Sequence, residues 1–285
     1  MNTNTKLRGA KISFIGGGNM AAALLGGLVR GGWPAEALAV AEPRAEQRRE
    51  LTRRFGVACF EDNAECAARA DAVVFAVKPQ ALREAANSVA DALRRGKPLL
   101  ISIAAGIRCD DLLRWAGGDF ALVRAMPNTP ALVGAGITGL FANAHASAAQ
   151  RELAQEVLRA AGGTLWVARE ELMDAVTAVS GSGPAYFFKM MEVMAESAAA
   201  HGLAREDAGE LAVQTALGAA ILAREHTSEG GSGPAELRRQ VTSPGGTTEA
   251  ALLAMENGGF ARALRGGMDA ARARAAEIAD ELGAG

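Results

Sequence analysis

The sequence predicts an α/β protein in two parts, a doubly wound parallel sheet followed by an all-helical region. Three observations predict this fold. Short apolar segments alternate with helix-like segments from residue 9 to about residue 168, as in repeated strand–helix units. A glycine-rich turn follows the first apolar segment, after Ile15. From Glu170 onward the strand-like segments disappear and long helical segments follow. We therefore expect one domain over 9–168 and a second over 169–285.

The glycine turn lies in the stretch Lys11–Leu25, which predicts a strand, a tight turn and a helix. Its small residues fit the dinucleotide-binding pattern G-x-G-x-x-A. The first glycine permits the sharp turn, the second lets the backbone approach a pyrophosphate, and the alanine lets the helix pack closely. Free N–H groups at the start of that helix would face the phosphates. The pattern predicts a Rossmann-type dinucleotide site formed by Gly16, Gly17, Gly18, Asn19, Met20 and Ala21. The alternative is a glycine-rich turn in an unrelated α/β fold.

The composition argues against several classes of partner. Of the 285 residues, 49% are hydrophobic and 22% are charged, an ordinary globular mixture. The net charge is −2 and no basic cluster is present, so we expect no nucleic-acid partner. No apolar run is long enough for a membrane span. The N-terminal stretch is polar and leads directly into a strand, so we expect no signal peptide and a cytoplasmic protein.

Cysteine and histidine give no indication of a metal centre. Cys59, Cys66 and Cys109 lack the spacing of metal ligands or of a redox pair, and we interpret them as small buried thiols in a reducing compartment. The three histidines form no recognisable constellation. We therefore expect no metal and no histidine-based triad.

The front part contains roughly eight predicted strands with helices between them. The strands after the first are expected at Leu38–Ala41, Val57–Phe60, Ala72–Val77, Pro98–Ile103, Leu122–Ala125, Gly136–Phe141 and Thr164–Val167. Helices are expected from a cap at Asp62 through Ala70, and over Leu82–Arg94 and Ala149–Ala161.

Charged side chains follow the second predicted strand. Glu42 stands where an acidic residue can hold the ribose 2′-OH of NAD. Arg44 and Arg48 come directly afterwards, and arginines there suit the 2′-phosphate of NADP. Glu42 can instead be an ordinary charge at a strand end, and the arginines a solvated helix face. These residues alone leave the choice between NADPH and NADH open.

Two further loops lie where ligands bind in doubly wound sheets. The strand that begins at Ala72 stops at Lys78–Pro79, because proline cannot donate to a ladder. The small residues Ala104–Gly106 follow the next strand. Both loops come at the carboxyl ends of strands, which open onto the ligand crevice. The small-residue loop suits a flat ring, and it also suits tight packing alone.

The rear part is predicted as a series of helices: Glu171–Val179, Ala185–Ala200, Glu206–Glu225, Ala235–Val241, Ala250–Glu256 and Ala261–Leu282. A break is expected over residues 180–184, with Pro184 at the start of the next helix. The helix that follows is apolar nearly all round, which indicates burial on several sides. We favour a dimer interface there; the alternative is the centre of a single-chain bundle.

The stretch Thr242–Glu249, TSPGGTTE, is interpreted as the substrate site. Its two glycines free the backbone, and the threonines after them start a helix. Open N–H groups and hydroxyls at a helix N-terminus suit a carboxylate. Plain N-capping is the alternative.

Six stretches together resemble the pyrroline-5-carboxylate reductase family: FIGGGNMAAALL, FAVKPQ, ISIAAGI, RAMPNTPALVGAGITGL, DAVTAVSGSGPAYFF and VTSPGGTTEAAL. They extend over nearly the whole chain. The resemblance implies a Rossmann-type domain followed by an all-helical dimerisation domain, with interlocked homodimers that often assemble into larger rings. It also implies NAD(P)H-dependent reduction of 1-pyrroline-5-carboxylate to L-proline, the last step of proline biosynthesis, with NADPH expected and NADH possible.

The resemblance also assigns site residues by position. It implies cofactor contacts beyond the glycine turn at Arg44, Asn63, Ala76, Val77, Lys78, Pro79, Ala105 and Gln240. It implies substrate contacts at Glu170, Gly245, Gly246, Thr247 and Thr248. Thr248 is the candidate catalytic residue, which would hydrogen-bond the ring nitrogen and relay the proton if the free imine binds. A protonated imine is already electrophilic, so positioning supplies most of the catalysis.

The sequence departs from the family pattern in two places. Gln240 stands where the family often has asparagine, and we expect a similar amide contact. The connector Glu229–Gly233 looks longer than usual.

Two other functions remain as alternatives. One is a β-hydroxyacid or imine reductase of the same architecture. Such β-hydroxyacid enzymes usually use a helical-domain lysine, and Lys189 is the only lysine in that part of the chain. The second is a non-catalytic dinucleotide-binding sensor, for which a degenerate substrate loop would be expected.

Overall fold

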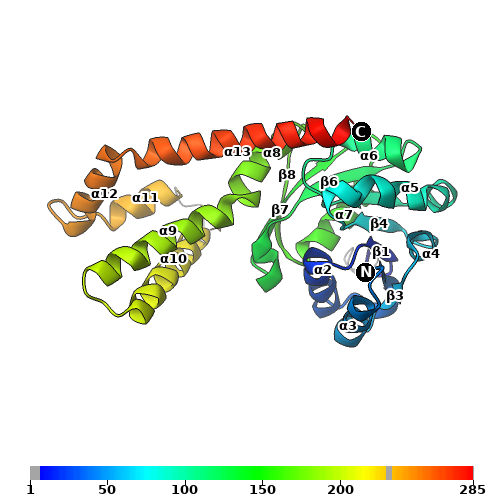
Figure 1. Cartoon of the computed structure of the whole chain (residues 1–285), viewed down its shortest axis with the longest axis horizontal. Helices are drawn as coiled ribbons and strands as arrows, with labels where there is room; N and C mark the ends of the chain where they lie inside the picture. The colour runs from blue at the N-terminus through cyan, green and yellow to red at the C-terminus, as the bar shows by residue number, and fades with distance from the viewer. Residues whose placement is uncertain (1–6, 229–232, 285) are drawn as a thin grey trace. The chain divides into compact units, whose positions relative to one another are not determined.

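The computed structural model of the chain describes residues 7–228 and 233–284. These residues form two compact units. The first, here called the sheet unit, comprises residues up to Ser182 together with those from Ala271 onward. The second, the helical unit, comprises Gly183–Ala270. Figure 1 shows the elements of both units coloured along the chain.

The sheet unit is built on a sheet with the strand order β3-β2-β1-β4-β5-β6-β7-β8. The strands from β1 to β6 are parallel, β7 is antiparallel to β6, and β8 is parallel to β7. Their bounds are β1 Ile12–Ile15, β2 Leu38–Ala41, β3 Ala58–Phe60, β4 Ala72–Phe75, β5 Leu99–Ser102, β6 Leu122–Met126, β7 Gly136–Ala142 and β8 Gly162–Trp166. The predicted Rossmann-type sheet is confirmed.

Helices cover both faces of this sheet. One face packs against α2 (Asn19–Arg30), α3 (Ala45–Phe55) and α7 (Ala148–Arg159). The other packs against α4 (Asn63–Ala67), α5 (Pro79–Gly96) and α6 (Cys109–Ala116). Successive side chains of a strand point to opposite faces. Phe14 therefore joins the first core and Ile15 the second, and both are fully buried.

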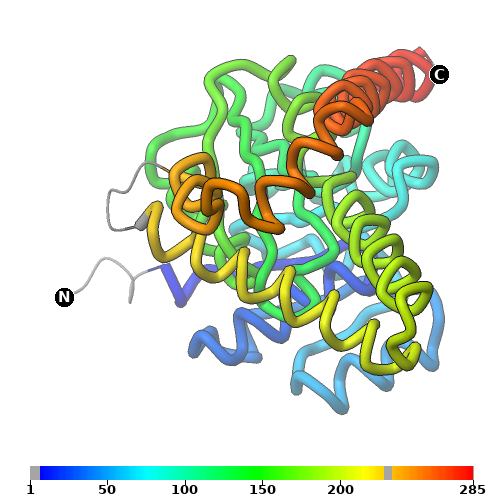
Figure 2. The backbone as a smooth tube through the Cα atoms, turned by 90° about the vertical axis from the view of Figure 1, so that its left-hand side faces the viewer, coloured from blue at the N-terminus to red at the C-terminus, as the bar shows by residue number. Residues whose placement is uncertain are grey.

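The helical unit contains α9 (Gly183–Ala200), α10 (Arg205–Ser228), α11 (Pro234–Gln240) and α12 (Thr247–Asn257). Helices α9 and α10 pack against each other, and Figure 2 shows them diverging from the turn that joins them. The last helix, α13 (Phe260–Gly283), begins in the helical unit, and its final turns belong to the sheet unit.

The expected break over residues 180–184 is reduced to Ser182, and Pro184 lies at the start of the next helix as expected. Helix α8 (Leu172–Val176) continues through the π-helical turn η3 (Thr177–Gly181), and α9 follows at Gly183. Hydroxyl groups satisfy backbone carbonyls along this stretch: Thr177 Oγ1 donates to the Met173 carbonyl at 2.8 Å and Ser180 Oγ to the Val176 carbonyl at 2.9 Å. The serine and glycine residues therefore do not end the helical path.

Other elements differ in smaller ways. Helix α6 was not expected, and two short 3-10 turns, η1 (Ala35–Ala37) and η2 (Thr129–Val133), are additions. Helix α5 begins at Pro79 rather than at Leu82, because proline is well suited to the first helical position. The connector residues 229–232 lie outside the described part of the chain, so its expected geometry is not tested. In the described part, no helix combines the length and apolar character that a bilayer crossing requires.

Candidate active site

The turn after β1 requires glycine at its first position. Gly16 has φ +100°, a conformation that side chains rarely adopt, and its amide donates to the Ala41 carbonyl at 2.8 Å. A Cβ atom at Gly16 would lie 2.8 Å from the carbonyl oxygen of Ala76, which is backbone. The turn therefore brings the ends of β1, β2 and β4 together in a way that only glycine permits.

The second glycine of the G-x-G-x-x-A pattern, Gly18, serves a different purpose. Gly18 precedes α2 as its N-cap, with φ −72° and no side-chain hydrogen bond capping the helix. A Cβ atom there would meet no atom within 4 Å. The backbone of Gly18 therefore borders open space at a helix N-terminus, where anions are stabilised. Ala21, one turn further on, is fully buried as close packing of α2 on the sheet requires. These features fit a dinucleotide pyrophosphate.

The strand order brings the other predicted loops beside this turn. Strand β1 lies between β2 and β4, and β5 lies beside β4. The Ala76 amide donates to the Ile15 carbonyl at 2.8 Å, and the Ile103 amide donates to the Phe75 carbonyl at 3.1 Å. The segment Ala76–Pro79 and the loop containing Ala105 therefore leave the same sheet edge as the glycine turn. Ligands of doubly wound sheets bind at this edge, where the strand order reverses.

The Glu42 carboxylate faces inward, onto the glycine turn and Arg44. Its side chain is 7% exposed, and its carboxylate accepts from Gly17 N at 3.2 Å, Arg44 N at 3.2 Å and Arg44 Nε at 2.8 Å. Burial by itself raises the pKa of Glu42, but the hydrogen bonds from Arg44 and Gly17 outweigh burial, so its pKa is lowered. Glu42 is therefore an ionised support for both the glycine turn and Arg44.

The arginines that follow β2 differ in their engagement. The Arg44 side chain is 68% exposed, and within it Nε donates a hydrogen bond to Glu42. Arg48 Nη1 donates to the carbonyls of Glu42 and Pro43, and Nη2 pairs with Glu61 at 3.0 Å. Arg44 therefore retains the donors that a phosphate would need, whereas Arg48 supports the loop.

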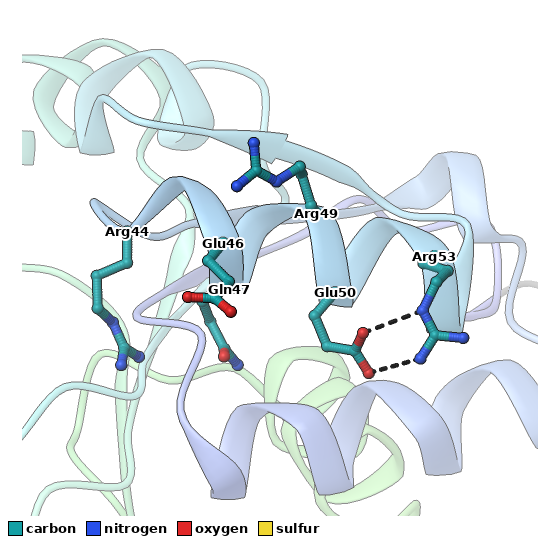
Figure 3. A pocket seen from close by; sticks show the side chains of 6 residues that line it. All are labelled: Arg44, Glu46, Gln47, Arg49, Glu50 and Arg53. Carbon is teal, nitrogen blue, oxygen red and sulfur yellow. Dashed lines mark hydrogen bonds and ion pairs between the residues drawn. The ribbon is translucent and has the colours of Figure 1, made fainter.

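A shallow pocket of about 530 Å³ lies along α3 next to Arg44. Figure 3 shows its lining side chains: Arg44, Glu46, Gln47, Arg49, Glu50 and Arg53. Glu50 and Arg53 pair with each other through two hydrogen bonds of 2.9 and 3.0 Å. Gln47 Nε2 donates to the Gly17 carbonyl at 2.8 Å, a contact with the glycine turn that no sequence pattern indicated.

Asn63 begins α4, just beyond β3, and Asp62 caps that helix by accepting from the Glu65 amide at 2.7 Å. The predicted cap is confirmed. The Asn63 amide donates to Ser88 Oγ at 3.0 Å, which links α4 to α5. Its cofactor contact remains a prediction.

Glu170 has structural partners in the sheet unit. Its Oε1 accepts from Arg124 Nη1 at 2.9 Å and from the Cys109 amide, the first of α6, at 2.8 Å. Arg124 is buried, and its other terminal nitrogen lies 3.9 Å from Asp174. Burial raises the pKa of Asp174 against the lowering effect of Arg124 and Arg108. Sequence reasoning missed this network. The substrate contact of Glu170 remains a prediction.

The predicted substrate loop lies in the helical unit at the start of α12. Gly245 has φ +69°, and its amide donates to Glu249 Oε2 at 2.7 Å. Gly246 is the N-cap of α12, which begins at Thr247 and has no side-chain hydrogen bond at its cap. Glu249 thus satisfies the turn and leaves the first helical amides without a side-chain cap. Gln240 ends α11, where its amide donates to Glu236 Oε1 at 3.3 Å. Its cofactor contact remains a prediction.

The cysteines are free thiols, and two of them are buried. Burial raises the pKa of Cys66 to about 12 and also raises the pKa of Cys109, so neither thiol is activated. In the described residues, no group of three or more histidine, cysteine or acidic side chains is arranged to hold a metal ion.

The strand order, the glycine turn and the helix N-terminus define the class: this is a protein with a Rossmann-type dinucleotide-binding sheet. Two family models match the chain. One, described as NADP oxidoreductase coenzyme F420-dependent, matches residues 11–106. The other, pyrroline-5-carboxylate reductase dimerisation, matches residues 170–278.

Relatives that match nearly the whole chain identify its family. It is 50% identical over 273 residues to the pyrroline-5-carboxylate reductase of Pseudomonas aeruginosa, covering 96% of this chain and 98% of that enzyme. The solved pyrroline-5-carboxylate reductase of Coxiella burnetii superposes with a TM-score of 0.89 at 39% identity, covering 95% of this chain and 98% of that one. The Plasmodium falciparum enzyme, solved with NADP bound, superposes with a TM-score of 0.81 at 27% identity. The match covers 95% of this chain and 98% of that one. The chain belongs to the pyrroline-5-carboxylate reductase family.

Proposed function

We propose that this enzyme reduces 1-pyrroline-5-carboxylate to L-proline, with NADPH as the hydride donor, in the last step of proline biosynthesis. The observation that carries the proposal is the glycine turn, open above Gly18, in a chain 50% identical to an enzyme of that name over nearly its whole length. The intact SPGGTT sequence argues against a non-catalytic sensor.

The coenzyme is assigned to the carboxyl edge of the sheet. The amides around Gly18 and the N-terminus of α2 would hold the pyrophosphate. Ala76–Pro79 and Ala105 would border the nicotinamide half, and Asn63 the ribose. When bound, the reduced nicotinamide supplies a hydride to the imine carbon that becomes Cδ of proline.

The start of α12 is assigned to the substrate. Backbone amides of Gly246, Thr247 and Thr248 would hold the carboxylate, because helix N-termini stabilise anions. Thr248 Oγ1 would hydrogen-bond the ring nitrogen. It would accept from the N–H of a protonated imine, or donate to the nitrogen of the free imine and relay a proton to it. This hydrogen bond would orient the ring and stabilise the change in charge on its nitrogen as the C=N bond is reduced. Glu170 and Gly245 complete the proposed substrate contacts.

NADPH is preferred over NADH in this proposal. Glu42 is buried, and both of its carboxylate oxygens already accept hydrogen bonds, one from Gly17 and the other from Arg44. Arg44 is exposed and held at one end, so its terminal nitrogens are available for a 2′-phosphate. We expect Arg44→Ala to lower the preference for NADPH over NADH about tenfold, with Arg49→Ala as the control from the same pocket.

The helical unit is proposed as the homodimer interface. Apolar side chains of α9 and α10 are exposed in the single chain, and an apolar groove of about 550 Å³ lies along them. A match to a dimerisation model over residues 170–278 supports the same assignment. The proposal also includes the assembly of dimers into rings and a cytoplasmic location. It divides the chain into a coenzyme domain over 9–168 and a helical domain over 169–285.

Initial rates test this function. We expect NADPH oxidation with 1-pyrroline-5-carboxylate, a lower kcat/KM with NADH, and no comparable rate with hydroxyacids or keto acids. Thr248→Ala should lower kcat/KM by about 100- to 1,000-fold if the lost donor acts on the transition state. Its NADPH affinity should remain unchanged. A loss smaller than about threefold would remove Thr248 from the mechanism.

A further inference from the structure

The loop from Ile103 to Arg108 connects β5 to α6 and carries Ala105, the proposed neighbour of the nicotinamide. Gly106 has φ +72°, so the loop has a fixed turn at its centre. Ala104 and Ile107 are buried on either side of Ala105 and Gly106. The position of this loop therefore depends on what packs against it.

The last turns of α13 pack against this loop and the start of α6. A Cβ atom on Gly106 would lie 2.6 Å from Ile278 Cγ2, so the glycine and the isoleucine are in close contact. Ala279 is 1% exposed, and Leu282 packs on the core cluster that contains Ala104 and Ile107. In Figure 1 the C-terminal end of α13 lies beside α6, in agreement with these contacts.

Polar contacts reinforce this packing. Arg108, the N-cap of α6, pairs with Asp280 at 2.7 Å. Arg114 on the same helix donates to the Gly283 carbonyl at 2.8 Å and to Asp111 at 2.8 Å. The Arg108–Asp280 pair lies at the surface, where an ion pair contributes modestly, whereas Asp111 is buried beneath Arg114. Together with Ile278 they hold the loop and α6 at several points.

We propose that Asp280 and Ile278 of α13 are positioning residues for the loop that carries Ala105, and therefore for the nicotinamide half of the coenzyme. The inference rests on the proposed coenzyme site. It predicts that the end of α13 affects how tightly the nicotinamide end is held, and not how the adenosine 2′-phosphate end binds near Arg44.

Asp280→Lys tests this inference, since it places a second positive charge beside Arg108. The control is Glu277→Lys, the same charge change on the same helix, where the partner is Arg274. The rescue variant adds Arg108→Glu to Asp280→Lys and restores an opposite-charge pair. Ile278→Ala provides a second, uncharged variant.

Dissociation constants are measured for NADPH, by its fluorescence, and for 2′,5′-ADP, which lacks the nicotinamide. Asp280→Lys should weaken NADPH binding about three- to tenfold, with 2′,5′-ADP binding within about twofold of wild type. Ile278→Ala should act in the same direction, the rescue variant should recover most of the loss, and Glu277→Lys should match wild type.

Three results would overturn the inference: unchanged NADPH binding in both variants, equal weakening of NADPH and 2′,5′-ADP, or no recovery in the rescue variant. Failure of the proposed function is distinguishable, because wild-type protein would then bind no NADPH or show no turnover with 1-pyrroline-5-carboxylate.

Discussion

The sheet unit and the helical unit bury their apolar residues to very different extents. In the sheet unit, Phe14 and Phe75 are fully buried, and two core clusters fill the two faces of the sheet. In the described residues of the helical unit, Ala208 and Ala212 are the only buried hydrophobic side chains, whereas Phe187 and Phe188 are 55% and 63% exposed. Exposed apolar surface of this extent marks an interface. The first unit has its own core, and we propose that the second buries its apolar side chains in a homodimer interface.

The largest expected effect is on the helical unit. Phe188→Asp should raise the dimer dissociation constant by at least about 100-fold, because an unpaired carboxylate is costly to bury in an apolar interface. Light scattering at micromolar protein measures the change. Lys189→Gln, the neighbouring position on α9, should remain a dimer. If Phe188→Asp has the mass of the wild type, this face of α9 is not the interface.

The next largest effect concerns Gly16 and Gly18, two of the glycines of the turn. Gly18→Ala should weaken NADPH binding about 10- to 100-fold, because its methyl group occupies the space into which the pyrophosphate would come. Its unfolding free energy should change by less than about 1 kcal/mol. Gly16→Ala, by contrast, should lower the unfolding free energy by about 2 kcal/mol or more, because its Cβ meets backbone at positive φ.

Titration calorimetry and urea unfolding separate the two effects. Equal loss of stability in both variants would show that Gly18 is a structural position and not part of the coenzyme site.

The smallest expected effect concerns Glu42. Its pKa is lowered in the folded chain, so its carboxylate stabilises the fold above its ordinary pKa of 4.5 and loses this contribution as the pH falls through the lowered value. Glu42→Gln should therefore cost about 1 kcal/mol at pH 7, and the difference from wild type should shrink as the pH falls below 4.5. Urea unfolding across this range measures it. A difference that is constant with pH would mean that ionisation of Glu42 does not support the turn.

Much of the sheet unit could be predicted from the sequence, because its signals are local. The run Ala72–Phe75, the cap at Asp62 and the fingerprint from Gly16 to Ala21 each depend on neighbouring residues. Helix α6 was missed, because its 8 residues are too few to show a clear helical period and its start depends on Glu170, distant in sequence. The structural role of Glu42, as an acceptor for Gly17 and Arg44, could not be predicted from its position in the sequence, because only the three-dimensional structure shows which way a carboxylate points.

The candidate site was predicted less completely than the fold. Family resemblance indicated the loops, but the supporting contacts of Gln47, Arg124 and Glu249 come from side-chain geometry that no motif encodes. The predicted break at residues 180–184 was too wide for a related reason. Serine and glycine usually end helices, but here the Ser180 hydroxyl satisfies a backbone carbonyl, and the helical path continues.

Transfer of a single labelled hydride tests the central claim most directly. The enzyme is supplied with unlabelled 1-pyrroline-5-carboxylate and NADPH that carries deuterium at the transferring C4 position, and the product is analysed by mass spectrometry and NMR. We predict L-proline with one deuterium, located at Cδ. L-Proline without deuterium at Cδ, or no proline at all, would contradict the account.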